Sequence, residues 1–142
     1  MAAPDFHSQL VVRLPGAPAQ VARARNAVTS AIGRDHPLHD EAVLLTSELA
    51  TNAVLHTQSG AGGTFTVSVR ATGDLVRVCV EDAGSDAPPC ACRAGGLTTS
   101  GRGLPLLEAL SHRWGFERSN GANCVWFELL QVTVPAVWAL QV

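Results

Sequence analysis

A carboxylate and a carboxamide stand one helical turn apart in the segment ELATNAVLH, which is predicted to form the second half of a helix. Glu48 and Asn52 would lie about 40° apart around the helix axis. An amide oxygen can help to hold a hydrated Mg²⁺, and the neighbouring carboxylate can accept a proton. The simpler interpretation is a solvated Glu and an Asn near a helix C-terminus. The surrounding apolar residues are expected in the core: Leu45, Leu49, Ala53 and Val54.

Asp82 comes where a predicted strand ends, and Gly84 follows closely. A buried carboxylate at that place could accept a hydrogen bond from the exocyclic amine of adenine, and glycine would let a base or sugar approach the backbone. The alternative is an ordinary Asx turn, in which the Asp side chain accepts a hydrogen bond from the nearby backbone. On this segment alone, both interpretations stay open.

Gly101, Arg102 and Gly103 lie at the start of another predicted helix. Flexible glycines there expose backbone N–H groups at the positive end of the helix dipole, which suits a phosphate group. Arg102 could bind a terminal phosphate through two parallel hydrogen bonds. The alternative is a helix-entry turn with a surface arginine, because Gly-x-Gly alone is common. Together with the two preceding features, this segment points to a nucleotide.

The elements that would position these residues follow from the spacing of apolar side chains. Alternating segments predict strands, and apolar residues three or four positions apart predict helices. The segment 84–103 is rich in Gly, Pro, Ala and Ser, and a loop of that length in a compact domain is typical of a lid or binding loop. The expected strands are Phe6–Leu14, Thr64–Ala71, Leu75–Glu81, Arg113–Arg118 and Cys124–Gln131, and the expected helices are Ala19–Ile32, Leu38–His56 and Leu104–His112.

Short turns at Thr72–Asp74 and Ser119–Asn123 are expected to join antiparallel strands. Mixed helices and strands with antiparallel pairs predict an α+β fold, a two-layer α/β sandwich with helices packed on one face of a mixed, mostly antiparallel sheet. Residues 1–142 are expected to form a single domain, with a core at about 6–130 and an apolar C-terminal tail at 131–142. The tail should pack on the domain or on a partner.

Composition excludes several classes of function. An apolar content of 46% and a charged content of 15% describe a globular chain and not a disordered one. A net charge of −2 gives no general attraction to nucleic acid or to an anionic membrane, so no direct nucleic-acid binding is expected. The N-terminus lacks a signal pattern and no apolar run is long enough to cross a membrane, so a cytoplasmic location is expected.

The chain has four cysteines, and in a reducing compartment they are expected to be free thiols. Cys90 and Cys92 form a C-x-C pair in the Gly- and Pro-rich segment. Without a second pair of ligands, that spacing is a weak indication of a metal site. The other two are Cys79 and Cys124.

Three segments, ELATNAVLHT, VEDAG and GRGLPLLEALSHRWGF, resemble in this order the N, G1 and G2 boxes of the GHKL (Bergerat-fold) ATPases. Within these histidine-kinase-like ATPases, the sequence is most similar to the stand-alone anti-sigma-factor serine/threonine-protein kinases. The resemblance runs from Phe6 to Leu130 and implies the Bergerat ATP-binding fold, with ATP and Mg²⁺ as cofactors.

Carried over to this sequence, the resemblance implies a role for each motif. Asn52 would coordinate the Mg²⁺ that bridges the phosphates of ATP, and Glu48 would be the general base that activates the attacking hydroxyl. Asp82 would bind the adenine amine, with Gly84 beside it. The remaining cofactor-binding residues would belong to the lid over the phosphates and the start of the following helix: Gly101, Arg102, Gly103 and Leu104. Such a site fits phosphoryl transfer, which depends mostly on positioning and charge neutralisation.

The activity implied by the resemblance is phosphorylation of a serine on an anti-anti-sigma (STAS) protein, alternating with capture of a sigma factor by a homodimer. This is regulation of transcription by partner switching. One alternative is a nucleotide-binding anti-sigma module without kinase turnover, but Glu48 favours the kinase because Mg·ATP binding alone needs no base. Another is a detached sensor-kinase ATPase domain, which would need a dimerisation helix with a phospho-acceptor histidine that the sequence does not contain.

Overall fold

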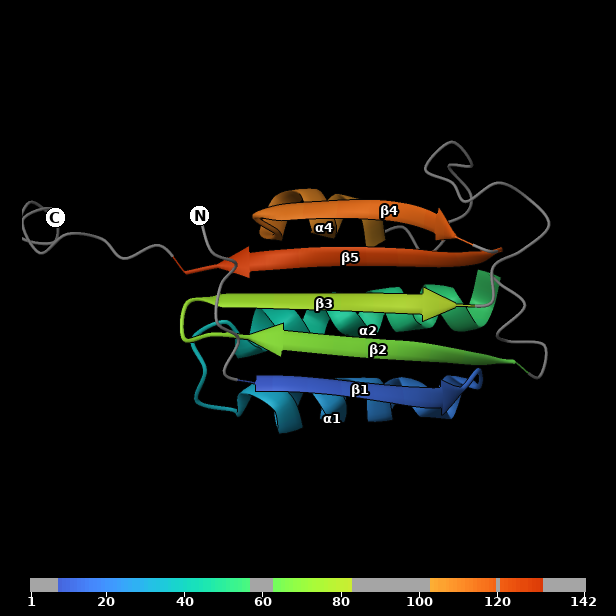
Figure 1. Cartoon of the computed structure of the whole chain (residues 1–142), viewed down its shortest axis with the longest axis horizontal. Helices are drawn as coiled ribbons and strands as arrows, with labels where there is room; N and C mark the ends of the chain where they lie inside the picture. The colour runs from blue at the N-terminus through green and yellow to red at the C-terminus, as the bar shows by residue number, and fades with distance from the viewer. Residues whose placement is uncertain (1–7, 57–62, 83–102, 120, 132–142) are drawn as a thin grey trace, which may run out of the picture.

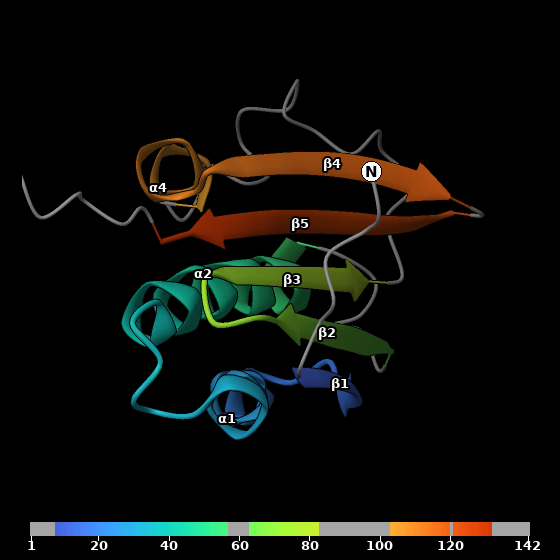
Figure 2. The same ribbon diagram turned by 60° about the vertical axis from the view of Figure 1, so that its left-hand side comes forward.

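The computed structural model describes residues 8–56, 63–82, 103–119 and 121–131. These residues form two layers, a sheet and the helices that cover one of its faces (Figures 1 and 2), which confirms the predicted α+β sandwich. In chain order the elements are β1 (Ser8–Pro15), the 3₁₀ helix η1 (Pro18–Gln20), α1 (Val21–Ile32), α2 (His39–His56), β2 (Thr64–Ala71), β3 (Leu75–Asp82), α4 (Gly103–Leu110), β4 (Arg113–Ser119) and β5 (Ala122–Leu130).

The sheet has the strand order β1-β2-β3-β5-β4. Each pair of neighbouring strands in this described part of the chain is antiparallel, so the sheet is more regular than the mixed one that was expected. Alternate residues of β2 and β3 are buried, because one face of these strands packs on the helices. The sequence alternation therefore predicted the strands, and the structure shows which face each presents to the core.

The turn between β2 and β3 is closed by the side chain of Thr72. Its Oγ1 accepts hydrogen bonds from the backbone N–H groups of Asp74 (3.2 Å) and Leu75 (3.0 Å). Its backbone N–H also donates to the carbonyl of Leu75 at 2.8 Å. These bonds fix the register of the hairpin and hence the position at which β3 ends.

His36 ties the connection between α1 and α2 to that same turn. Its Nε2 donates to the carbonyl of Thr72 at 2.9 Å, and its Nδ1 accepts from the backbone N–H of Leu38 at 3.0 Å, which requires the Nε2-protonated neutral ring. Inside the helix layer, the ring of His39 bonds the hydroxyl of Thr29 at 2.8 Å. The start of α2 is thereby held against both α1 and the sheet.

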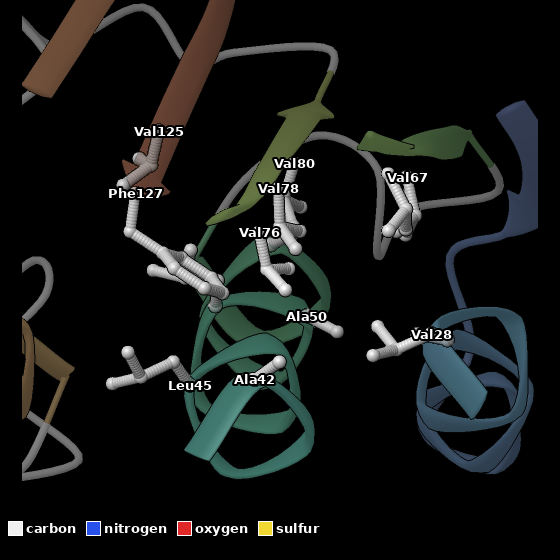
Figure 3. Packing of buried hydrophobic residues seen from close by; sticks show 14 of the residues in the cluster. Val28, Ala42, Leu45, Ala50, Val67, Val76, Val78, Val80, Val125 and Phe127 are labelled. Atoms are coloured by element: carbon white, nitrogen blue, oxygen red, sulfur yellow. The ribbon is translucent and has the colours of Figure 1, made fainter. Parts of the chain in front are cut away.

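The core lies between α1, α2 and the inner face of the sheet (Figure 3). Alanines on α2 are fully buried, among them Ala42 and Ala50, and their small side chains let the helix approach the strands closely. Valine and phenylalanine side chains from the sheet fill the space opposite: Val67, Val76, Val78, Val80, Val125 and Phe127. The four residues expected in the core of α2 are all buried: Leu45, Leu49, Ala53 and Val54.

The second hairpin is tighter than predicted. Ser119 pairs with Ala122, so positions 120–121 alone connect β4 to β5, and Gly121 has φ +82°. A two-residue loop with Asn-Gly commonly adopts a turn with positive φ, which suits glycine. Asn123, which was expected in the turn, therefore belongs to β5. Helix α4 is also shorter than the predicted helix at its C-terminal end.

The expectation of four free thiols is wrong for two of them. Cys79 on β3 and Cys124 on β5 form a disulfide, with their Cα atoms 6.4 Å apart, a distance typical of bridged cysteines. Cys90 and Cys92 lie outside the described residues. Among the helices that the structure describes, none is both long and apolar enough to span a membrane.

Candidate functional site

Helix α2 carries the polar pair Glu48 and Asn52, one helical turn apart. Glu48 is half-buried at the edge of the helix layer, whereas Asn52 is only 4% exposed. Neither Oδ1 nor Nδ2 of Asn52 has a hydrogen-bond partner among the described residues. An unpaired buried amide is costly, on the order of 1–3 kcal/mol. Asn52 is therefore well placed to bind a polar ligand.

Asp82 is the last residue of β3 and is 9% exposed. It continues the inward-facing column of Val78 and Val80, so an acidic side chain ends a row of buried valines. Its Cα partners on the neighbouring strands are Phe65 of β2 and Asn123 of β5. This position agrees with the predicted buried carboxylate at a strand end, and the residues that would form an Asx turn with it lie outside the described residues.

Asn123 was not among the predicted site residues. It is 5% exposed, lies directly opposite Asp82 in the ladder, and its Oδ1 has no partner among the described residues. The alternation of buried residues along β5, which continues through Val125 and Phe127, places its side chain on the helix-facing side. That alternation could have indicated its position from sequence, if the preceding turn had been assigned its correct length.

These polar residues come together at one end of the sandwich. In Figure 1 the C-terminal part of α2, the arrowhead of β3 and the beginning of β5 lie at the same end. Asn52, Asp82 and Asn123 are thus buried polar side chains at the same end of an otherwise apolar layer. The other buried polar residues lie elsewhere in the fold: His39 bonds Thr29, Glu128 bonds Arg77 and Arg113, and the Oγ1 of Thr46 on α2 has no partner among the described residues.

The remaining predicted residues are only partly described. Gly103 and Leu104 form the first turn of α4, one residue earlier than the predicted start of that helix. Gly84, Gly101 and Arg102 lie outside the described residues. Their proposed contacts with a nucleotide therefore stay predictions.

The described residues offer an oxygen that suits a nucleotide-bound Mg²⁺. They contain no group of three or more His, Cys, Asp or Glu side chains that could hold an ion. Mg²⁺ commonly takes one or two protein oxygens and completes its octahedron with phosphate oxygens and water. The unpaired Oδ1 of Asn52 is an oxygen of that kind.

The comparisons with known proteins agree with the fold. A family model of the histidine kinase-like ATPase domain matches residues 14–129, which is most of the chain. The structure of the RsbU and RsbW domains of Rv1364c from Mycobacterium tuberculosis is similar in fold, with a TM-score of 0.64 and 22% sequence identity. That match covers 94% of this chain and 34% of the other, so the present chain spans about a third of its length. No curated protein shows significant similarity to the sequence. On the match to residues 14–129, the chain belongs to the histidine kinase-like ATPase domain family.

Proposed function

We propose that the chain is an ATP-binding anti-sigma regulatory factor with serine-protein kinase activity toward an anti-anti-sigma (STAS) partner. The observation that carries the proposal is the buried, unpaired amide of Asn52, one turn after Glu48 on α2 and at the end of the sandwich where Asp82 is buried. In an ATPase domain family, this is a suitable arrangement for Mg·ATP and for a base beside it.

Each residue has a distinct task in this mechanism. Asp82 would accept a hydrogen bond from the exocyclic amine of adenine. Asn52 would hold the Mg²⁺ through Oδ1, and a bound ion would supply charge neutralisation at the phosphates. Glu48, half-buried and one turn earlier, accepts the proton of the attacking serine hydroxyl. Gly84, Gly101, Arg102, Gly103 and Leu104 are proposed to complete the nucleotide site.

The biological role is a second part of the proposal. Kinase activity toward a STAS protein would alternate with binding of a sigma factor, in the cytoplasm and in the form of a homodimer. Sigma-factor pull-down and sedimentation of the purified chain test the partner and the dimer separately from catalysis. These parts rest on the resemblance of the sequence motifs to anti-sigma-factor kinases.

Two substitutions on α2 test the catalytic proposal. Glu48→Ala should retain Mg·ATP binding, measured by calorimetry, while transfer of labelled phosphate to a STAS protein falls about 10²–10⁴-fold. Asn52→Ala should lose nucleotide affinity itself. Thr51→Ala is the matched control, because its hydroxyl bonds the carbonyl of Ser47 within the helix and should not affect ATP.

The outcomes separate the candidate functions. Transfer by Glu48→Ala at the wild-type rate would remove Glu48 as the base. ATP binding without transfer to any STAS protein would leave a nucleotide-binding anti-sigma module. If the wild-type chain ignores ATP in the presence of Mg²⁺, the proposal as a whole is wrong.

A further inference from the structure

The disulfide between Cys79 and Cys124 lies on the face of the sheet that the helices leave open. Val78 and Val80 of β3 point toward the helices, so Cys79 between them points the other way, and it is half-buried. Cys124 is also half-buried and alternates with the inward-facing Asn123 and Val125 of β5. Figures 1 and 2 show that the helices cover only the opposite face. A reductant can therefore approach the bond from the open side of the sheet.

The same disulfide is next to the buried polar end of β3 and β5. Cys124 directly follows Asn123, and Cys124 lies opposite Glu81 while Asn123 lies opposite Asp82. Cys79 itself lies opposite Trp126, so the covalent link runs diagonally between the strands and starts on β5 one residue from the Asp82–Asn123 pair. The β3–β5 ladder ends at the Asp82–Asn123 pair, and the link adds a covalent constraint to the backbone pairing near this end.

We propose that Cys79 and Cys124 form a reversible thiol–disulfide site whose oxidation state sets the nucleotide affinity of the chain. The effect on nucleotide affinity rests on the proposed function, which assigns Asp82 to adenine. In the oxidised state, the link keeps Asp82 and Asn123 in register beneath the base. In the reduced state, the two strand ends separate and shift more freely, so binding must first order them. In the cytoplasm, the location proposed above, disulfides are mostly transient, which fits a regulatory bond better than a permanent one.

The exchange needs a dithiol reductant and consumes no other reagent. One thiolate of the reductant attacks one sulfur of the pair, forms a mixed disulfide and expels the other cysteine as a thiolate, which takes up a proton. The second thiol of the reductant then attacks the mixed disulfide and releases the remaining cysteine. Two electrons and two protons pass to the protein, and the reductant leaves as a disulfide. A dithiol in its oxidised form carries out the reverse reaction.

Wild-type protein prepared with dithiothreitol or with its oxidised form tests both halves of the proposal. Alkylation in denaturant, followed by mass spectrometry, should modify Cys79 and Cys124 only after reduction. Calorimetry with Mg·ATP should then give a dissociation constant at least about fivefold higher for the reduced protein, a typical allosteric coupling. The Cys90→Ser/Cys92→Ser variant should keep this difference, and the Cys79→Ser/Cys124→Ser variant should lose it.

Each contrary outcome has a separate meaning. Equal affinity in the two redox states overturns the coupling and leaves the proposed function intact. ATP binding by neither state overturns both proposals. Alkylation of Cys79 and Cys124 without prior reduction shows that the bond does not form in solution. A redox effect that follows Cys90 and Cys92 instead also overturns the assignment.

Discussion

Asp82 and Asn123 lie directly opposite each other at the end of the β3–β5 ladder, and both are buried on the side that faces the helices. The neighbouring residues of the same inward columns are apolar, Val80 before Asp82 and Val125 after Asn123. A carboxylate and an amide in this position form a small polar area at the end of an apolar layer. Because the carboxylate can only accept hydrogen bonds when ionised, the pair is suited to a ligand that donates one.

Replacement of this carboxylate tests the recognition of adenine. Asp82→Asn exchanges an acceptor for a group that can present an N–H₂ to the amine of the base, so ATP affinity should fall by about 10- to 100-fold, or about 1.4–2.8 kcal/mol. Calorimetry with Mg·ATP measures the change, and Mg·GTP shows whether the preference for adenine is lost.

Glu81→Gln is the matched control for that substitution. Glu81 precedes Asp82 on β3, is exposed and lies on the opposite face of the sheet. Its substitution therefore removes the same charge without changing the buried end of the strand. ATP affinity should stay within twofold of wild type, roughly 0.4 kcal/mol. An equal loss in both variants would indicate a general charge effect and would contradict the specific role of Asp82.

Local periodicity was enough to predict most of the fold. The alternation in TFTVSVRA and LVRVCVE predicted β2 and β3, and β3 extends one residue further to include Asp82. The helical spacing gave α2 and the shared turn of Glu48 and Asn52. Each of these elements has its own strong sequence pattern, because one face is buried and the other is not.

The parts that were missed depend on contacts distant in sequence or on the exact length of a turn. Asn123 lies at the buried polar end only because a two-residue loop starts β5 at Ala122. The predicted strand started two positions later, at Cys124, and therefore left Asn123 in the turn. The Cys79–Cys124 bond joins positions 45 residues apart, and no local pattern indicates that β3 lies beside β5. The β3–β5 pairing crosses over α4 and β4 in the chain, so it is a property of the whole fold.

Glu128 should make the stability of the chain depend on pH in the acid range. Its carboxylate accepts hydrogen bonds from Arg113 (2.8 Å) and Arg77 (2.7 Å), and its side chain is 10% exposed. The hydrogen bond from Arg113, aided by Arg77, lowers the pKa of Glu128 against the opposing effect of burial. A lowered folded pKa gives stability that is present above the unfolded pKa of about 4.3 and is lost as pH falls through the folded value.

Glu128→Gln should therefore lower the free energy of unfolding at neutral pH by about 2 kcal/mol. The value lies between those of exposed and buried ion pairs, because the carboxylate is buried while its partner Arg113 is largely exposed. The deficit relative to wild type should shrink as the pH falls below about 4.3, where the unfolded chain takes up the proton, and should vanish below the lowered pKa of folded Glu128. Urea unfolding between pH 3 and 7 measures both effects. Glu117→Gln is the control, because Glu117 is an exposed residue of β4, and it should change the free energy of unfolding by less than about 0.5 kcal/mol. A pH-independent deficit would contradict the ion-pair explanation.

The disulfide should also contribute to global stability. It closes a loop between positions separated by 45 residues, for which the chain-entropy model gives about 4 kcal/mol as an upper figure. Urea unfolding of the wild type with and without dithiothreitol should show a midpoint that falls on reduction. The Cys79→Ser/Cys124→Ser variant should have the lower midpoint in both conditions. A wild-type midpoint that does not respond to reduction would mean that the link adds nothing to folding.

Gly115 should tolerate no side chain, because the indole of Trp126 lies directly over it. A Cβ at this position would come within 2.6 Å of three atoms of that ring. The ring has little freedom to move, since the guanidinium of Arg77 lies 4.4 Å from its centroid and that of Arg113 lies 5.8 Å away. Gly115→Ala should therefore lower the free energy of unfolding by about 1–3 kcal/mol, the range for overpacked sites.

Gly73→Ala is the matched control, because a Cβ there would meet no atom within 4 Å and the substitution should be close to neutral. Urea unfolding of both variants measures the difference. The additional substitution Trp126→Ala separates steric overlap from an intrinsic need for glycine in β4, since it removes the ring that a Cβ would strike. If Gly115→Ala costs as much in the Trp126→Ala background as in wild type, the clash with the indole is not the reason.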